Sequence, residues 1–290
     1  MRLFVLTALV LVAFASNSVL NRIAVADGAM GSTSFVGIRI LSGAVMLSIL
    51  MLARRRAVAP LLTRSRLWGA GWLALYALGN SFAFERLEAG AGSLILFGGV
   101  QLTMFGGALY LGERIPRQRW FGAAIAFAGL AWLMWPSGAS APNLTGALIM
   151  VVAAFAWGIY SLLGRGARDP MGETAINFIL AAAITGVVMV LRPDGISTLG
   201  IICAVLSGAI ASGLGYSLWY AVLPKIPAAL AAVAQLTVPV LAALGGVLTL
   251  GEPITWRFVI ATAVVLGGLA LSSLRARSPR ADRNAPARQD

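Results

Sequence analysis

Charges are almost absent from ten long stretches of this 290-residue chain, and this feature restricts its fold more than any other. A helix needs about 20 mostly apolar residues to cross the roughly 30 Å hydrocarbon core of a bilayer. Stretches of about that length, rich in Leu, Ala, Val and Gly, occupy residues 3–26, 32–53, 67–84, 90–111, 120–135, 144–163, 173–191, 197–222, 226–250 and 256–274. They lack the alternation of apolar and polar residues that is typical of a transmembrane β-strand. The sequence therefore predicts an all-α integral membrane protein with ten transmembrane helices.

The overall composition excludes several other classes of protein. Of the residues, 59% are hydrophobic and 11% are charged, whereas soluble proteins average about 45–50% and 25%. The net charge of +12 comes from basic residues that are spread between the apolar stretches, so we do not expect nucleic acid as a partner. The chain has no His and a single cysteine, Cys203, which excludes an internal disulfide and any site that depends on histidine. We expect no cofactor and no metal.

The positions of the basic residues predict an orientation. If the N-terminus lies in the cytoplasm, most Arg and Lys residues fall on the cytoplasmic side, and the other side carries Arg86, Arg192 and Arg257. Such an asymmetry is the usual determinant of membrane topology. We therefore expect cytoplasmic termini and a basic, disordered tail at 275–290. A cleaved secretory signal within residues 1–26 is the alternative, but its apolar stretch is longer than usual for such a signal.

The chain contains an internal repeat. Residues 106–113 (GGALYLGE) and 245–252 (GGVLTLGE) are identical at six of eight positions, at an offset of 139. Residues 13–15 and 154–156 both read AFA, at an offset of 141. The chain is thus predicted to consist of two five-helix repeats, residues 1–142 and 143–274. Because five is odd, the second repeat is inverted in the membrane, which is the arrangement that gives a central site one gate on each side.

The repeat motifs also resemble a known group of proteins. The sequence LGERI at 111–115, the glycines that follow it, and YSLWYAVL at 216–223 with LGE at 250–252 resemble the drug/metabolite transporter superfamily, in its ten-helix branch with two EamA-type domains. Within the superfamily the chain looks most like YddG-type exporters of aromatic and other amino acids. The first repeat departs in having FAS at 14–16 where a Trp-Gly pair is common. The resemblance implies a multi-pass inner-membrane exporter of small metabolites with a central cavity.

Polar and aromatic residues well inside the predicted spans are candidates for the wall of that cavity. An amide both donates and accepts hydrogen bonds without titrating, so it suits either end of a zwitterion. The alternative for each residue is a hydrogen bond between helices, or, for an aromatic residue, a place in the interfacial belt. The predicted substrate-binding residues are Asn17, Asn80, Gln101, Trp157, Tyr160, Asn177, Tyr216 and Gln235.

A further set of residues is predicted to shape the gates. Pro239 removes a backbone hydrogen bond from its helix, which makes it a candidate hinge, and Gly98 and Gly99 permit bending or close packing. Glu113 and Glu252 end the two matched helices, where each is expected to contact the next helix or, alternatively, to act in a gate.

Two arginines lie inside the predicted spans. Arg39 lies about 10 Å inside its span at 1.5 Å per residue. Its side chain is expected either to extend to the outer surface or to sit in the cavity mouth near a substrate carboxylate. Arg22 is closer to its helix end and is expected to reach the surface.

These features together predict a monomeric carrier, with membrane lipid around it, that exports amino acids or related metabolites by alternating access. The amide and aromatic wall favours aromatic or hydrophobic amino acids. No Asp, Glu or His lies in the middle of a span, so strong proton coupling is not expected. The alternatives are a multidrug or other metabolite exporter of the same superfamily and, more remotely, a channel or a membrane-embedded enzyme, although the chain lacks acid–base groups for catalysis.

Overall fold

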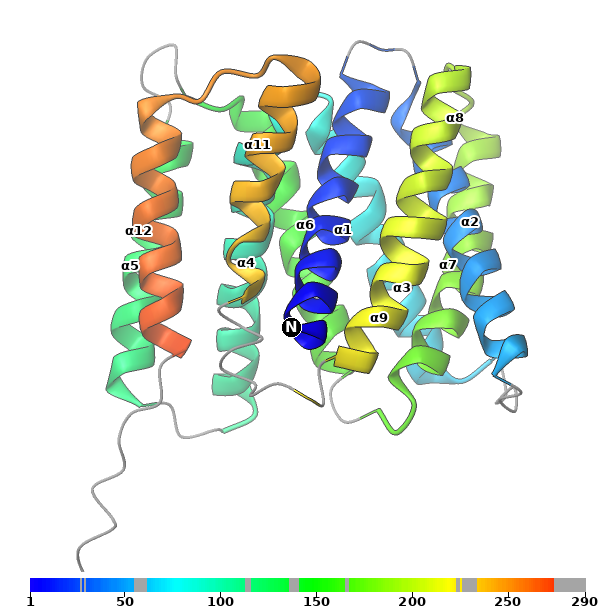
Figure 1. Ribbon diagram of the computed structural model, residues 1–290, viewed down its shortest axis with the longest axis horizontal. Coiled ribbons are helices and arrows are strands. Elements are labelled where there is room, and N and C mark those ends of the chain that lie inside the picture. Colours follow the sequence, from blue (N-terminus) through cyan, green and yellow to red (C-terminus); the bar gives the residue numbers. More distant parts are fainter. Residues whose placement is uncertain are drawn as a thin grey trace, which may run out of the picture.

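The computed structural model describes residues 1–26, 28, 30–54, 62–112, 116–135, 141–164, 167–222, 225 and 234–273. Its regular elements in these ranges are all helical (Figure 1). They are α1 (Arg2–Val25), α2 (Ser32–Ala53), α3 (Arg64–Phe84), α4 (Ala89–Tyr110), α5 (Arg117–Met134), α6 (Leu144–Leu163), α7 (Pro170–Leu191), α8 (Thr198–Val205), η1 (Leu206–Leu214), α9 (Gly215–Val222), α11 (Val238–Leu250) and α12 (Trp256–Ser273).

Most helices begin and end within three residues of the predicted spans. At several of the helix starts, local capping residues explain this agreement. The side chains of Thr63, Asn143 and Ser197 accept hydrogen bonds from the first turns of α3, α6 and α8. Pro170 occupies the first turn of α7, where its missing N–H costs nothing. The predicted tail at 275–290, Glu113 and the start of the ninth predicted span lie outside the described residues.

The described helices form a membrane protein. Six of them, counting α8, η1 and α9 as one, are long and apolar enough to cross a bilayer, and α11 and α12 are shorter apolar helices. Large apolar side chains such as Leu41, Phe127, Val190 and Leu248 are exposed on the outside of the bundle. So much exposed apolar surface requires a lipid environment. The prediction of an all-α integral membrane fold is therefore confirmed.

The helices pack in a pattern that remains the same when the two predicted repeats are exchanged. Helix α3 packs on α6, and its counterpart α8–η1–α9 packs on α1; α4 packs on α6, and α11 packs on α1. The pairs α2–α7, α4–α11 and α5–α12 each join counterparts. The α5–α12 pair forms one edge of the molecule in Figure 1, and it is packed tightly, since a Cβ on Gly268 would lie 2.7 Å from the backbone of α5.

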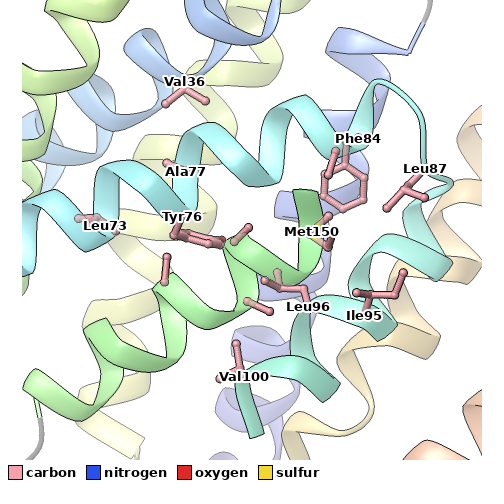
Figure 2. Packing of buried hydrophobic residues seen from close by; sticks show 14 of the residues in the cluster. Val36, Leu73, Tyr76, Ala77, Phe84, Leu87, Ile95, Leu96, Val100 and Met150 are labelled. Carbon is pink, nitrogen blue, oxygen red and sulfur yellow. The ribbon is translucent and has the colours of Figure 1, made fainter. Parts of the chain in front are cut away.

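The main core joins α3, α4 and α6 and extends into α1, α2, α5, α7, α8 and α12. Figure 2 shows Phe84, Leu87, Ile95 and Met150 gathered where α3 turns into α4, and Tyr76 further along α3 beside α6. This core includes α3 and α4, which carry the predicted site residues Asn80 and Gln101. It therefore holds the candidate site on rigid elements.

The eighth predicted span contains a π-helical segment, η1, which the sequence analysis did not predict. Gly208 in η1 lies against the backbone of α2, where a Cβ would come within 2.0 Å of the carbonyl oxygen of Arg39. Ser207 and Ser212 of the same segment donate hydrogen bonds to Oδ1 of Asn17, at 2.7 and 3.3 Å. Widened turns of this kind occur frequently at functional sites.

Candidate functional site

The site is a cavity of about 470 Å³ between the helices of the two predicted repeats. Helices α1, α3, α4, α6, α7 and α9 contribute to its wall, as does Gln235 just before α11. The cavity reaches the surface at the exposed residues Gly164 and Pro170, between α6 and α7. We call this end, which also carries the first residues of α3, the open face. Along α1 and α3 the lining residues farthest from this end are Ser18 and Asn80, and we call the opposite end of the bundle the closed face.

All eight residues predicted to bind substrate line this one cavity. From six helices and the segment before α11 the structure brings together the residues Asn17, Asn80, Gln101, Trp157, Tyr160, Asn177, Tyr216 and Gln235. A second hollow of about 400 Å³ adjoins the cavity at Tyr160, Gly164 and Asn177 and widens its mouth. Substrate binding itself stays a prediction.

The amides differ in how far the protein satisfies them. Oδ1 of Asn17 accepts hydrogen bonds from two serines of η1, so this side chain also joins two helices. The side chain of Asn80 is 2% exposed, and its Oδ1 has no hydrogen-bond partner within the described residues. Oδ1 of Asn177 is likewise buried and unpartnered there. Since an unmet buried acceptor is costly, Asn80 and Asn177 are poised to accept a hydrogen bond from a ligand.

Aromatic rings form the rest of the wall. The Trp157 ring lies between Tyr76, at a centroid distance of 4.5 Å, and Tyr216, at 5.9 Å. Phe14 lies 5.5 Å from Tyr216. Tyr76 and Phe14 were not predicted as site residues, although Tyr76 lies one helical turn from Asn80 on the same face of α3, which is the signal that could have found it. The wall suits a solute with a flat or apolar part.

A carboxylate lines the cavity, although no Asp or Glu lies in the middle of a predicted span. Glu173, in the first turn of α7, lies at the mouth. Arg66 of α3 binds it in a bidentate manner, with Nε at 2.9 Å from Oε2 and Nη2 at 2.6 Å from Oε1. The sequence analysis did not include Glu173 because it is the first residue of the predicted span 173–191. A charge at that position is typical of a helix end and did not indicate a cavity residue.

The closed face is held by contacts between the two predicted repeats. Nε of Arg22 lies 3.0 Å from Oε1 of Glu252, and its Nη1 donates to the carbonyl oxygen of Phe84 at 2.8 Å. The backbone N–H of Ala89, at the start of α4, donates to Oε2 of Glu252 at 2.8 Å. The expectation that Arg22 reaches the surface is thus wrong, while for Glu252 the alternative of a gate role stays open. Arg22 points inward to a partner, and Glu252 binds α1 and α4 rather than the next helix, because the bundle brings these distant segments together.

A second carboxylate seals the same face at the start of α2. Asp194 accepts hydrogen bonds from the backbone N–H groups of Thr33 and Ser34, at 2.8 and 3.0 Å, and from the hydroxyl of Thr33 at 2.5 Å. Burial alone would raise the pKa of Asp194, but these hydrogen bonds outweigh burial and hold the pKa below its ordinary value. The positive end of the α2 dipole acts in the same direction.

Arg39 takes neither of the places that the sequence suggested. Its side chain is 2% exposed, so it does not extend to the surface, and it does not line the cavity mouth. It lies behind Tyr76, to whose hydroxyl oxygen its Nη2 donates at 3.4 Å. Tyr76 itself lines the cavity, whereas Arg39 does not.

The predicted hinge residues have identifiable structural roles. Pro239 lies in the first turn of α11, immediately after a break in the helix at Leu236 and Thr237. Gly98 and Gly99 lie within the unbroken helix α4, and a Cβ on them would meet Leu130 of α5 at 2.9 Å and Ala154 of α6 at 2.7 Å. The two glycines therefore serve close packing here, while the break before Pro239 is a place where the chain can bend.

Comparison with known proteins identifies the family. The profile of the EamA-like transporter family matches residues 144–274. An uncharacterized protein of Pseudomonas aeruginosa is 47% identical over 275 residues, which make up 93% of this chain and 94% of the relative. The chain belongs to the EamA-like transporter family. The resemblance to the drug/metabolite transporter superfamily is confirmed, and the family indicates a transporter.

Two further comparisons extend this EamA assignment. The threonine/homoserine exporter RhtA of Salmonella typhimurium is 30% identical over 163 residues, which are 53% of this chain and 54% of the exporter. A crystal structure of a protein with 22% identity superposes with a TM-score of 0.65 over 91% of this chain and 96% of that chain. At this identity the superposition establishes the fold alone.

Proposed function

We propose that this EamA-family transporter is a carrier that exports amino acids, with a preference for aromatic or hydrophobic ones, by alternating access across the inner membrane. The observation that carries the proposal is the cavity lined by amides and aromatic rings, which reaches one face and is closed at the other. Its volume of about 470 Å³ suits a solute of amino-acid size. The exporter RhtA, named for threonine and homoserine, supports an amino acid as the substrate class.

The wall chemistry matches a zwitterion with an apolar side chain. Asn80 and Asn177 offer buried acceptors without partners, which suit an ammonium group. The stacked rings of Trp157 and Tyr216 offer a flat apolar surface for the side chain. Such a site prefers larger, apolar amino acids over small polar ones.

The inverted repeat supports alternating access with ten transmembrane helices. Gly112 and Gly251, from the two matching LGE motifs, both have positive φ, at 72° and 64°, directly after their helices. The family profile spans residues 144–274, which is almost the extent predicted for the second repeat. Exchanging the conformations of the two repeats would open the face that is closed here and close the open one.

Transport should be driven by the substrate gradient. The one carboxylate that lines the cavity among the described residues, Glu173, is already paired with Arg66. A cationic-drug exporter, the rival from the same superfamily, would need a free carboxylate there. With the predicted orientation, the open face is cytoplasmic and both termini lie in the cytoplasm, and the protein acts as a monomer.

Counterflow of radiolabelled phenylalanine, leucine, threonine and homoserine into proteoliposomes tests the proposal. The variants Asn80→Leu and Gln101→Leu should each reduce counterflow about tenfold or more, since a lost buried hydrogen bond costs about 1–3 kcal/mol. Gln118→Leu is the matched control, because its amide binds the carbonyl of Leu271 at 3.0 Å outside the cavity. Saturable counterflow that both cavity variants leave intact would remove the cavity assignment, and no counterflow by the wild type would remove the proposed function.

A further inference from the structure

Arg39 is a buried positive charge whose presence the packing does not explain. Its side chain is 2% exposed, and its Nε and Nη1 have no hydrogen-bond partner in the described part of the chain. None of the ion pairs between described residues includes it. A charge in a transmembrane helix is expensive and is usually retained for a function, with its partner in a cavity or on a neighbouring helix.

The one side chain to which Arg39 donates a hydrogen bond within the described residues belongs to the cavity wall. Nη2 donates to the Tyr76 hydroxyl oxygen at 3.4 Å, and Cζ lies 5.8 Å from the centre of the Tyr76 ring. The Tyr76 ring also lines the cavity and packs against Trp157, at a centroid distance of 4.5 Å. Tyr76 thus connects the charge of Arg39 to the cavity.

The direction of this hydrogen bond determines what the cavity offers. Since the Tyr76 oxygen accepts from Arg39, its own O–H is left to donate elsewhere, and no acceptor for it is found in the described residues. A guanidinium in a weakly screened interior also polarises this hydroxyl and makes it a stronger donor. The group that such a site binds is an anionic acceptor.

A hydrogen-bond acceptor lies one helical turn from the Tyr76 hydroxyl donor. Asn80 follows Tyr76 by four residues on the same face of α3, and its Oδ1 is buried and unpartnered. The wall thus has a donor backed by a positive charge beside a neutral acceptor. This order matches the carboxylate and the ammonium group of an α-amino acid.

We propose that Arg39, acting through the Tyr76 hydroxyl, makes the cavity selective for solutes that carry a carboxylate. The inference rests on the proposed carrier function and adds the chemical group that the carrier requires. Arg39 is a positioning residue that does not touch the substrate, and Tyr76 is the residue that donates to it. Amines of the same shape without the carboxylate are rejected, because they place a second cation near Arg39.

Competition in reconstituted full-length protein tests this selectivity. Radiolabelled phenylalanine counterflow is measured against unlabelled phenylalanine and against phenethylamine, which lacks only the carboxylate. The wild type should prefer phenylalanine, and Arg39→Gln should reduce that preference about tenfold or more by raising the KM for phenylalanine, as expected for a lost charge-assisted contact. Tyr76→Phe should have the same effect, and Arg39→Lys should keep most of the preference.

The control separates selectivity from folding. Arg257→Gln also removes a buried arginine, but this one binds the carbonyl oxygens of Trp132 and Trp135 at the α5–α12 edge, away from the cavity. Arg257→Gln should leave the preference for phenylalanine over phenethylamine unchanged. A purely structural defect at Arg39 would also leave this preference unchanged. An unchanged ratio in Arg39→Gln would overturn the inference and leave the carrier intact. A wild type that carries phenethylamine but not phenylalanine would overturn both the inference and the proposed amino-acid substrate, as would a wild type that carries neither solute.

Discussion

The two ends of the bundle are closed to different degrees by the same kinds of charged side chain. At the closed face, Glu252 and Asp194 bind helix starts, and each accepts from backbone N–H groups of the other predicted repeat. At the open face, Glu173 meets the side chain of Arg66 and stays 36% exposed. The carboxylates of the closed face are therefore hydrogen-bonded to the backbone, whereas the carboxylate of the open face forms a partly solvated ion pair with a side chain. A face that is fixed through the backbone keeps the cavity shut there.

The largest effect is expected from breaking the Arg22–Glu252 pair. The variant Glu252→Gln leaves Arg22 without its anion, while the side chain of Arg22 is 19% exposed. Removing one partner of a buried pair costs about 3–5 kcal/mol, and the partial exposure of Arg22 places the expected loss near the lower end. Thermal unfolding in detergent measures this loss.

The double variant Arg22→Gln with Glu252→Gln is the control for that measurement. It should recover part of the stability, because no uncompensated charge remains. If the single variant were as stable as the wild type, the closed face would not depend on this pair, and the comparison between the two faces would fail.

A smaller effect is expected at the second seal. Asp194→Asn keeps the shape of the side chain but removes the charge at the start of α2, which should cost about 1–2 kcal/mol. Because folding lowers the pKa of Asp194, its contribution is present above the ordinary pKa of about 3.9 and is lost as the pH falls through the lower value in the folded protein. The difference in stability between wild type and variant should therefore shrink in acid.

Glu88 also changes the stability as the pH falls, so the effect of Asp194 must be measured as the difference between the wild type and Asp194→Asn. Burial, and then the nearby charge of Glu252, raise the pKa of Glu88, although Arg22 acts in the opposite direction. Protonation of Glu88 thus favours the folded state as the pH falls, which masks part of the loss at Asp194 in either protein alone. A stability difference that stayed constant down to pH 2 would show that Asp194 does not titrate as the geometry implies.

The two faces also show what the sequence could predict. The helices follow from local hydropathy and capping residues, so their positions were predicted within a few residues. The amides of the cavity were found because a polar group in an apolar span stands out. The partners of Arg22, Arg39 and Glu252 were not predicted, because each depends on which distant helices meet. The π-helical segment η1 was missed for the same reason, since it depends on Gly208 meeting α2.

The smallest effect on stability is expected at the open face. A small effect there would give the clearest contrast with the closed face. Glu173→Gln removes a partly exposed ion pair, and such pairs contribute about 0–1 kcal/mol, so the unfolding temperature should change little. If Glu173 takes no part in coupling, the variant and the wild type should respond equally weakly to an imposed pH gradient during substrate uptake. The matched variant Arg66→Gln tests the partner. Accumulation driven by a pH gradient in the wild type and absent in Glu173→Gln would instead make this carboxylate a proton site, because a pair that breaks and reforms at the open face could then bind a proton in each transport cycle.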